Sequence, residues 1–533
     1  MYNNIIMRKF EVFLKIILLL SLYCSIKSEE IYMEPSQQFR GVWISPYNEG
    51  PNERTLLFQD EESFKTKIIN ILETIKSFNM NSIIFHVRIN NDAFYQSQLN
   101  PLNSYYQKVD FSQFDPIDWL INETHKRGIE FHAWMNPYRV CSDKTKIAEA
   151  IQKVANFPQN PANDPNNLII GQKYVILDPG SEVVRKFIID TVKEFLKKYK
   201  NVDAIHFDDY FYIEVDNEKK TEEEKRENIN ILLKSLHEEI ISFNLHNNKH
   251  VQFGISPTGI YKNGNGIVEY DSLGNAITSG SDTNGQEHYQ YYLYCDSLKW
   301  INEGWIDYIL PQSYWSFEQY NANFSKVTSW WNKVTANKAI NLYSGIGLYK
   351  CNEKDTLGWL NEDGNELFNQ LNFINNEEFS NNIDGVSIYN FRFLLSNNNI
   401  ASVCHKLIEN GMKIWKTKVP PSVIKSFDEI KLPNPENFKF EGDNLSFNKV
   451  KDSKFYVIYR SKGNVEFNSS EIVDIFGSDE EIVTWNDTLK GTFNYGVKAL
   501  SYSNTLGEGA LYTYGRYLSS RFIYLVSMII YLL

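Results

Sequence analysis

The chain has 533 residues, a formal net charge of −12 and 15% aromatic residues. This length suits one large domain and one smaller module better than a single average domain. The acidic balance excludes nucleic acid as an expected partner and disfavours polyanions. Neutral sugars meet no such repulsion, and their rings stack on aromatic side chains, so the composition favours a polysaccharide ligand.

Residues 1–28 have the order of a secretory signal peptide. Basic Arg8 and Lys9 precede an apolar run, Ile16–Leu20, and small residues follow up to Ser28. A retained membrane anchor is the weaker alternative, because the apolar run is short for a spanning helix. Cleavage after Ser28 removes four basic residues and one acid, which leaves a net charge of −15. We therefore expect a secreted or cell-surface protein.

Four cysteines remain outside this segment, and none lies in a C-x-x-C pair that would indicate zinc: Cys141, Cys295, Cys351 and Cys404. One or two disulfides can form from them in a secreted chain, but the sequence does not give the pairing. Five N-glycosylation sequons begin at Asn122, Asn323, Asn444, Asn468 and Asn486. No motif calls for a cofactor or a resident metal ion.

Short β-rich runs alternate with longer amphipathic ones between residues 39 and 415, which is typical of parallel strands joined by helices. Asp115 with Pro116 predicts one helix start, and Gly128 predicts the end of that helix. The eight expected strands are 39–47, 82–90, 129–136, 203–210, 251–257, 306–314, 339–345 and 385–391. Eight such units predict an α/β fold, a (β/α)8 TIM barrel.

The composition changes after the barrel. A proline-bearing linker occupies 416–435, and β-type runs separated by turn residues follow over 436–512. We expect a small all-β sandwich there, similar to a fibronectin type III module. Residues 513–533 form a polar spacer and an apolar tail that fits a GPI-attachment signal, with a tail anchor or a buried terminal strand as alternatives. This tail would be the only membrane contact.

Residue parity indicates which side chains face the C-terminal mouth of such a barrel, where barrel sites lie. One strand beginning near Asp203 ends in two adjacent carboxylates, and alternation places Asp208 inward while Asp209 follows past the strand end. Asp92 and Asp178 are the other acids near the mouth, although Asp178 fits a turn or helix cap equally well. The inward set from parity includes His86, Arg88, His132, Trp134, Asn136, His206, Asp208, Gln312, Tyr314 and Tyr389.

Motifs in order along the barrel resemble the glycosyl-hydrolase-like family ten. They are Phe39–Trp43, His86–Arg88, Asp92–Tyr95, Phe114–Pro116, His125–Val140, Leu177–Gly180, His206–Tyr212, Phe253–Pro257 and Pro311–Trp315. The resemblance implies a (β/α)8 glycoside hydrolase, often followed by a fibronectin-like module, and bacterial members are associated with peptidoglycan glycan strands. Where bacterial relatives often carry an acid, this chain has Asn100, which puts activity in question.

Glycoside cleavage needs one carboxylic acid to protonate the leaving oxygen and one carboxylate to attack or to activate water. We predict Asp208 as nucleophile or base and Asp209 or Asp92 as general acid. The predicted substrate contacts are His86, Arg88, His132, Trp134, Asn136, Asp178, His206, Gln312, Tyr314, Trp315 and Tyr389. Two other hypotheses are a metal-dependent deacetylase, from the three inward histidines, and a non-catalytic glycan-binding surface protein.

Overall fold

The computed structural model describes the greater part of the chain. The described residues are 36–47, 56–215, 219–353, 356–375, 382–395, 402–441, 443–468, 470–489 and 492–512. The predicted signal peptide 1–28 and the tail 513–533 lie outside them. Within these ranges, no helix combines the length and the apolar character that crossing a membrane requires.

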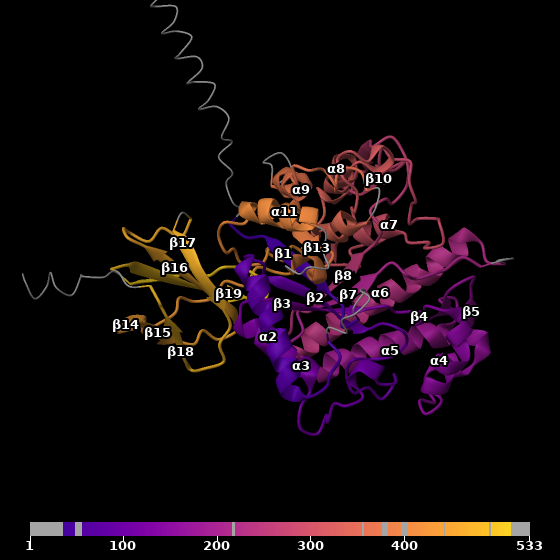
Figure 1. The fold of residues 1–533 in the computed structure, drawn as a ribbon, viewed down its shortest axis with the longest axis horizontal. Helices are drawn as coiled ribbons and strands as arrows, with labels where there is room; N and C mark the ends of the chain where they lie inside the picture. Colours follow the sequence, from indigo (N-terminus) through magenta and orange to yellow (C-terminus); the bar gives the residue numbers. More distant parts are fainter. Residues whose placement is uncertain are drawn as a thin grey trace, which may run out of the picture. The chain divides into compact units, whose positions relative to one another are not determined.

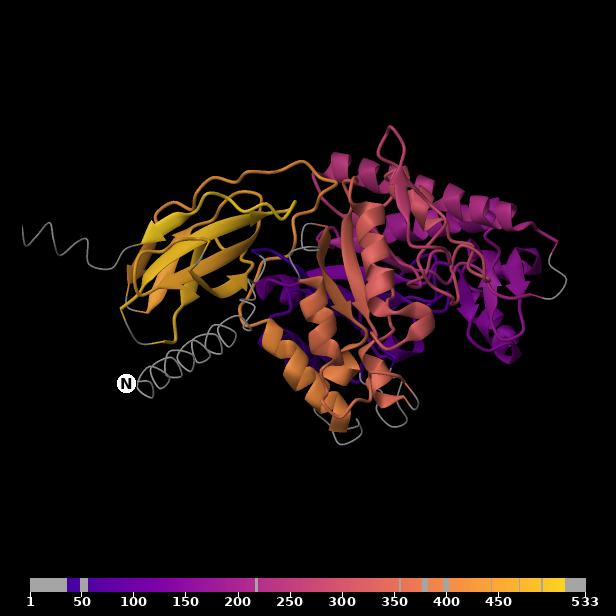
Figure 2. The ribbon, with the colours of Figure 1, turned by 90° about the horizontal axis from the view of Figure 1, so that it is seen from above.

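Eight parallel strands close into a barrel in the order β1-β13-β12-β11-β8-β7-β3-β2. They are β1 (Phe39–Ile44), β2 (Ser82–Arg88), β3 (Glu130–Met135), β7 (Ala204–Asp208), β8 (Gln252–Ser256), β11 (Tyr308–Ile309), β12 (Asn341–Ile346) and β13 (Ile383–Ile388). The helices lie outside this ring of strands (Figure 1, Figure 2). The predicted TIM barrel and its eight strands are confirmed.

The helix α3 begins and ends at the local signals that the sequence carries. Asp115 caps α3 by accepting hydrogen bonds from the backbone of Ile117 and Asp118, and Gly128 follows with a left-handed φ of 69°. The helices of the described residues are α2 (Glu61–Ser77), α3 (Pro116–Lys126), α4 (Ile147–Val154), α5 (Glu182–Lys198), α6 (Glu222–Asn247), α7 (Ser297–Asn302), α8 (Phe324–Thr335), α9 (Glu366–Ile374) and α11 (Ser402–Gly411).

Two small antiparallel sheets lie in long loops after β3 and β8, and the sequence analysis did not predict them. One joins β4 (Arg139–Cys141), β6 (Val175–Leu177) and β5 (Leu168–Ile170), and the other pairs β9 (Val268–Tyr270) with β10 (Ala276–Thr278). Because these loops leave the C-terminal ends of strands, they add walls to the mouth of the barrel. A disulfide joins Cys351 to Cys404, while Cys141 and Cys295 are buried free thiols.

The C-terminal region forms two antiparallel sheets, β14-β15-β18 and β17-β16-β19-β20, drawn in orange and yellow in Figure 1. The strands are β14 (Lys439–Glu441), β15 (Asn444–Asn448), β16 (Ser453–Ser461), β17 (Glu471–Phe476), β18 (Ile482–Asn486), β19 (Asn494–Ser501) and β20 (Ala510–Tyr512). Leu445, Tyr456 and Val497 belong to the core shared by both sheets. The small all-β domain is confirmed, and its fibronectin type stays a prediction.

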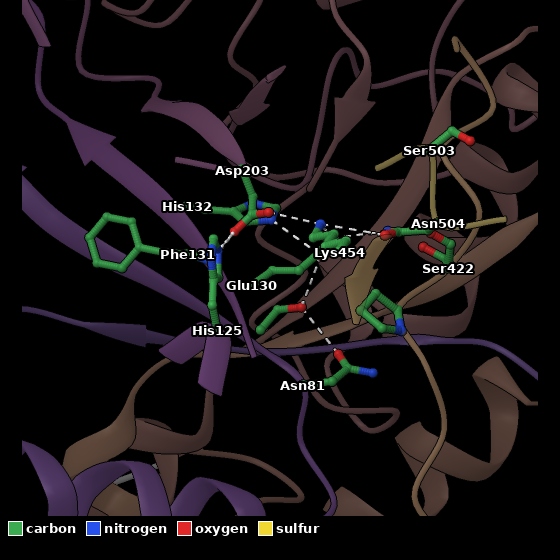
Figure 3. A network of polar contacts seen from close by, with 12 residues as sticks. Asn81, His125, Glu130, Phe131, His132, Asp203, Ser422, Lys454, Ser503 and Asn504 are labelled. Atoms are coloured by element: carbon green, nitrogen blue, oxygen red, sulfur yellow. Dashed lines mark hydrogen bonds and ion pairs between the residues drawn. The ribbon is translucent and has the colours of Figure 1, made fainter. Parts of the chain in front are cut away.

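A buried ionic cluster joins this region to the N-terminal ends of the barrel strands (Figure 3). Lys454 Nζ lies 2.5 Å from Glu130 Oε1 and 2.8 Å from Asp203 Oδ1. Asn504 Nδ2 donates to Glu130 Oε1 at 2.9 Å, and His125 Nε2 lies 2.8 Å from Asp203 Oδ2. Glu130 opens β3 and Asp203 directly precedes β7, so the cluster lies at the end of the barrel opposite the mouth.

Candidate active site

A cavity of about 670 Å³ opens at the C-terminal ends of the barrel strands. Pockets that hold small ligands typically measure about 300–1,000 Å³. Eight of the predicted site residues line it: His86, Trp134, Asn136, Asp208, Gln312, Tyr314, Trp315 and Tyr389. Most of the residues predicted to face the mouth of the barrel therefore lie together at this cavity.

Asp208 is the last residue of β7, and it faces the cavity although only 2% of its surface is exposed. The neighbouring strand β3 supplies its partners: Trp134 Nε1 donates to Asp208 Oδ2 at 3.1 Å. With its amide nitrogen turned toward the carboxylate, Asn136 donates to Oδ2 at 2.5 Å and to Oδ1 at 3.2 Å. These donors fix the orientation of the carboxyl group toward the cavity.

The electrostatic environment makes Asp208 a proton-exchanging group near neutral pH. Burial raises the pKa of Asp208 to about 7; the positive charge of Arg139 opposes this rise, and the adjacent Asp209 carboxylate adds to it. Burial also raises the pKa of Asp209 to about 6, against the hydrogen bonds from Thr258. Such perturbed carboxyl groups in a cleft mark candidate catalytic sites.

Asp209 does not line the cavity, although it is adjacent to Asp208. Its Oδ2 atom accepts a hydrogen bond from the backbone N–H of Thr258 at 2.5 Å, and the side chain is 1% exposed. Thr258 itself is part of the cavity wall. The carboxyl group of Asp209 thus influences the site in two ways: its charge acts on Asp208, and its hydrogen bond positions Thr258 in the cavity wall.

Aromatic faces form much of the cavity wall. The rings of His86 and Trp134 are stacked with centroids 3.6 Å apart, and Tyr314 stacks with Tyr389 at 5.6 Å. Trp43 meets Tyr389 edge-on at 5.7 Å. Burial and the nearby Arg139 hold the pKa of His86 well below its usual value, so its ring is neutral. A wall of flat neutral rings fits the apolar faces of sugars.

Arg88, predicted to face the mouth, does not line the cavity. The pairing of β2 with β3 shifts register between His86 and Arg88, and such a bulge breaks the alternation on which parity depends. The Arg88 guanidinium donates to the backbone oxygen of Asn136 at 2.5 Å and to Asn100 Oδ1 at 3.1 Å. Asn100 is therefore a buried hydrogen-bond partner of Arg88. It does not line the cavity, so an acid at this position would not be one of the cavity carboxylates.

Asp92 and Asp178 also lie away from this cavity. Asp92 Oδ2 accepts from Asn103 Nδ2 at 2.7 Å, and Asp92 lines a smaller cavity of about 240 Å³ that shares Tyr47, Asn90 and Ser142 with the larger one. Asp178 pairs with Lys220 at 2.9 Å and accepts from Gly180 N at 2.8 Å. Asp178 thus has the turn-capping role that the sequence left open.

His132 and His206 lie one layer deeper in the barrel and do not line the cavity. Their Nδ1 atoms are each 2.9 Å from the hydroxyl of Tyr308, and His206 Nε2 is 2.9 Å from Ser256 Oγ. Parity gave their direction correctly but not their depth. Among the described residues, no three His, Cys, Asp or Glu side chains are grouped to hold a metal ion.

Sequence reasoning missed several residues that line the cavity. Arg139 comes from β4, with its guanidinium 4.3 Å from the ring of Tyr210. Glu353 follows the short helix η6 (Leu348–Asn352) in the loop after β12, with Lys350 Nζ 2.8 Å from its carboxylate. Both lie outside the eight barrel strands, to which the parity rule was applied. Arg139 could have been found from its place in the His125–Val140 motif.

The family model described as glycosyl hydrolase-like 10 matches residues 38–224 and 215–360, which include seven of the eight barrel strands. The chain belongs to this glycosyl hydrolase-like 10 family. Asp208, Trp134, Asn136 and Arg139 all lie inside the matched part. The matched part therefore includes the residues that line the cavity except Tyr389, and the C-terminal sheets lie beyond it.

Two relatives of this glycosyl hydrolase-like 10 protein carry hydrolase names. Glycosyl hydrolase YngK of Bacillus subtilis is 27% identical over 81% of this chain and 84% of its own. Glycosyl hydrolase DigH of Escherichia coli K12 is 29% identical over 63% of this chain and 80% of its own. An Anoxybacillus α-amylase structure aligns over 87% of this chain and 98% of its own, with 12% identity and a TM-score of 0.40, a likeness that says nothing about activity.

Proposed function

We propose that the protein is a glycoside hydrolase that cleaves O-glycosidic bonds in a polysaccharide, of the peptidoglycan glycan-strand type. The observation that carries this proposal is Asp208, a buried carboxyl group with a pKa near 7 in a cavity walled by aromatic rings. The family membership and the names of the relatives support the same class of reaction. The peptidoglycan-type substrate is an expectation from the family resemblance.

Asp208 is the group proposed to exchange a proton with the glycosidic oxygen. The sequence favoured a nucleophile or base at this position, but a pKa near 7 keeps a large share of Asp208 protonated at neutral pH, which suits a proton donor. Asp209 keeps that pKa high through its charge. Donation of the proton leaves Asp208 ionised, and Trp134 and Asn136 stabilise that carboxylate by hydrogen bonding. The water that attacks the sugar gives up a proton, which restores the protonated form of Asp208 for the next cycle.

Glu353 is proposed as the second carboxylate, in place of Asp209 or Asp92. Among the described residues, Asp208 and Glu353 are the acids that line the cavity. The Glu353 side chain is 46% exposed and pairs with Lys350, so its carboxylate is accessible from the cavity to activate water or to attack the sugar.

The Glu353→Gln substitution should lower kcat by roughly 10²-fold or more, because it removes the carboxyl group without changing side-chain size. Glu303→Gln, an exposed glutamate at the end of α7, is the matched control and should keep wild-type turnover. Release of reducing ends measures both variants. Wild-type turnover by Glu353→Gln would contradict this assignment.

The pH profile tests the role of Asp208 as proton donor. The value of kcat/KM should fall about tenfold per pH unit above pH 7, because the free protein then loses the proton of Asp208. Asp209→Asn removes the charge that raises the pKa of Asp208, so the alkaline limb should move to lower pH. An alkaline limb that stays in place or moves upward in this variant would contradict the coupling of the two residues.

The substrate itself is identified by digestion. Intact peptidoglycan, peptide-stripped peptidoglycan, chitin and other polysaccharides are incubated with the protein, and mass analysis identifies released sugars. Release from none of them would remove the hydrolase proposal and leave a glycan-binding protein as the alternative. Asn100, one reason for that alternative, lies outside the cavity. Release of acetate that a chelator abolishes would instead favour the metal-dependent deacetylase.

Secretion remains part of the proposal. The Cys351–Cys404 disulfide supports an oxidising compartment, in agreement with the predicted signal peptide and sequons. The predicted GPI signal would keep the protein at the cell surface.

Two sheets of three and four strands, with Tyr495 Oη bonded to Asp487 Oδ2 at 2.8 Å near the start of β19, support a fibronectin type III-like module.

A further inference from the structure

A second cavity, of about 290 Å³, adjoins the first at the mouth of the barrel. Arg139, Tyr210 and Gln286 line both cavities, so a chain molecule bound in the larger one can continue into the smaller one along a shared wall. Since the larger cavity alone holds Asp208, the smaller one has no direct part in the chemistry.

Tyrosine rings dominate this second cavity. Tyr174, Tyr210, Tyr212, Tyr291 and Tyr292 line it together with the polar side chains of Gln172, Lys173, Glu214 and Gln286. Tyr210 is 44% exposed and Tyr291 is 52% exposed, whereas Tyr212 is buried. Large rings gathered at the surface in this way indicate a binding site, because isolated exposure is ordinary but clustered exposure is unfavourable in water. Flat rings surrounded by amide and charged groups fit pyranose rings and their hydroxyls.

The loop that presents two of these rings has a constrained backbone. Tyr291, Tyr292 and Tyr294 have φ values of 22°, 69° and 54°, in the left-handed region that side-chain-bearing residues rarely adopt. Such conformations are unfavourable for residues with a side chain, and they gather at ligand sites. The loop is held by Lys225, whose Nζ lies 4.2 Å from the Tyr294 ring, and by the Cys295 N–H, which donates to His288 O at 2.8 Å.

We propose that this tyrosine-lined cavity binds further sugar units of the same glycan chain that occupies the Asp208 cavity. The inference rests on the proposed function and deepens it: the substrate is a polymer, and affinity grows with chain length. The shared wall of Arg139, Tyr210 and Gln286 argues for one continuous ligand over a second, separate molecule.

The test compares short and long glycans in wild type and Tyr291→Ala. The probes are chitin oligosaccharides from disaccharide to octasaccharide and peptide-stripped glycan strands. Binding is measured by calorimetry with proteins that also carry Asp208→Asn, so that the glycan is not cleaved. Hydrolysis is measured with proteins that keep Asp208. Loss of one stacking ring should weaken binding and raise KM about five- to tenfold for long chains and leave disaccharide binding unchanged. Tyr291→Phe keeps the ring and should restore affinity.

Tyr320→Ala removes an exposed tyrosine outside both cavities, and it should change neither the binding nor the hydrolysis of short and long chains. Hydrolysis that is independent of chain length, or an equal effect of Tyr291→Ala on short and long chains, would contradict glycan binding in the second cavity. The hydrolase proposal would stand. Length-dependent binding that requires the Tyr291 ring, without hydrolysis by wild type, would overturn the hydrolase and keep this cavity. No binding of any glycan would overturn both.

Discussion

Asp208→Asn is expected to abolish glycan cleavage, lowering kcat by roughly 10³-fold or more, with the fold intact. The asparagine keeps the size of the side chain and its contact with Trp134, but it cannot give or take the proton. Products from the glycan that the wild type cleaves are quantified by mass analysis. Turnover at the wild-type rate in this variant would exclude Asp208 as the central catalytic group.

The same variant should be at least as stable as the wild type at pH 8. Burial raises the folded-state pKa of Asp208 above that of the unfolded chain, so the folded state loses stability progressively from about pH 4, where the unfolded carboxyl group ionises, and the loss is complete above about pH 7. Replacement by a neutral amide should increase the free energy of unfolding there by up to about 4 kcal/mol, since each tenfold change in the ionisation equilibrium is worth about 1.4 kcal/mol, and the gain should vanish below about pH 4. This pH-dependent gain separates a catalytic role from a folding defect.

Asp178→Asn is the matched control for activity. The sequence placed Asp178 among the substrate contacts, but its carboxylate pairs with Lys220 and caps a turn outside the cavity. Its kcat should stay within a few-fold of the wild type. A loss as large as that of Asp208→Asn would mean that acidic residues around the mouth act through stability and not through chemistry.

The fold was predictable because its signals are periodic and local. Eight β-rich runs with helical runs between them leave few alternatives to a closed parallel barrel, and each cap, such as Asp115 with Pro116, marks an end. Parity within a strand is local as well, which is why Trp134 and Asp208 were placed at the cavity. Where one extra residue enters a strand, as between His86 and Arg88, parity gives the wrong side.

The remaining site residues depend on tertiary structure that no local pattern encodes. His132 and His206 point inward as predicted, but the distance along the strand sets their depth, and Tyr308 from another strand occupies the space between them. Glu353 and Arg139 come from loops whose path is fixed by packing. The sequence therefore located the carboxyl group at the strand end and missed the acid proposed to work with it.

Lys454→Met is expected to be the most destabilising of these substitutions, lowering the free energy of unfolding by about 3–5 kcal/mol. Lys454 is buried between Glu130 and Asp203, and its removal leaves two carboxylates without their cation in the interior. Lys449→Met, in the same sheet region but paired with Asp479 at the surface, should cost less than about 1 kcal/mol. Urea unfolding measures both; equal losses would mean that the buried cluster does not hold the sandwich to the barrel.

The pH dependence of this loss has a defined sign. Burial alone would raise the pKa values of Glu130 and Asp203, but the charge of Lys454 outweighs it and holds both below their usual values. The stabilisation is therefore complete above about pH 4.5, where the unfolded carboxylates are ionised, and is lost as the pH falls toward the folded-state values. The difference in free energy of unfolding between the wild type and Lys454→Met should therefore become smaller below pH 4. The triple variant Lys454→Met, Glu130→Gln, Asp203→Asn should recover part of the loss, because the penalty lies in unpaired buried charge.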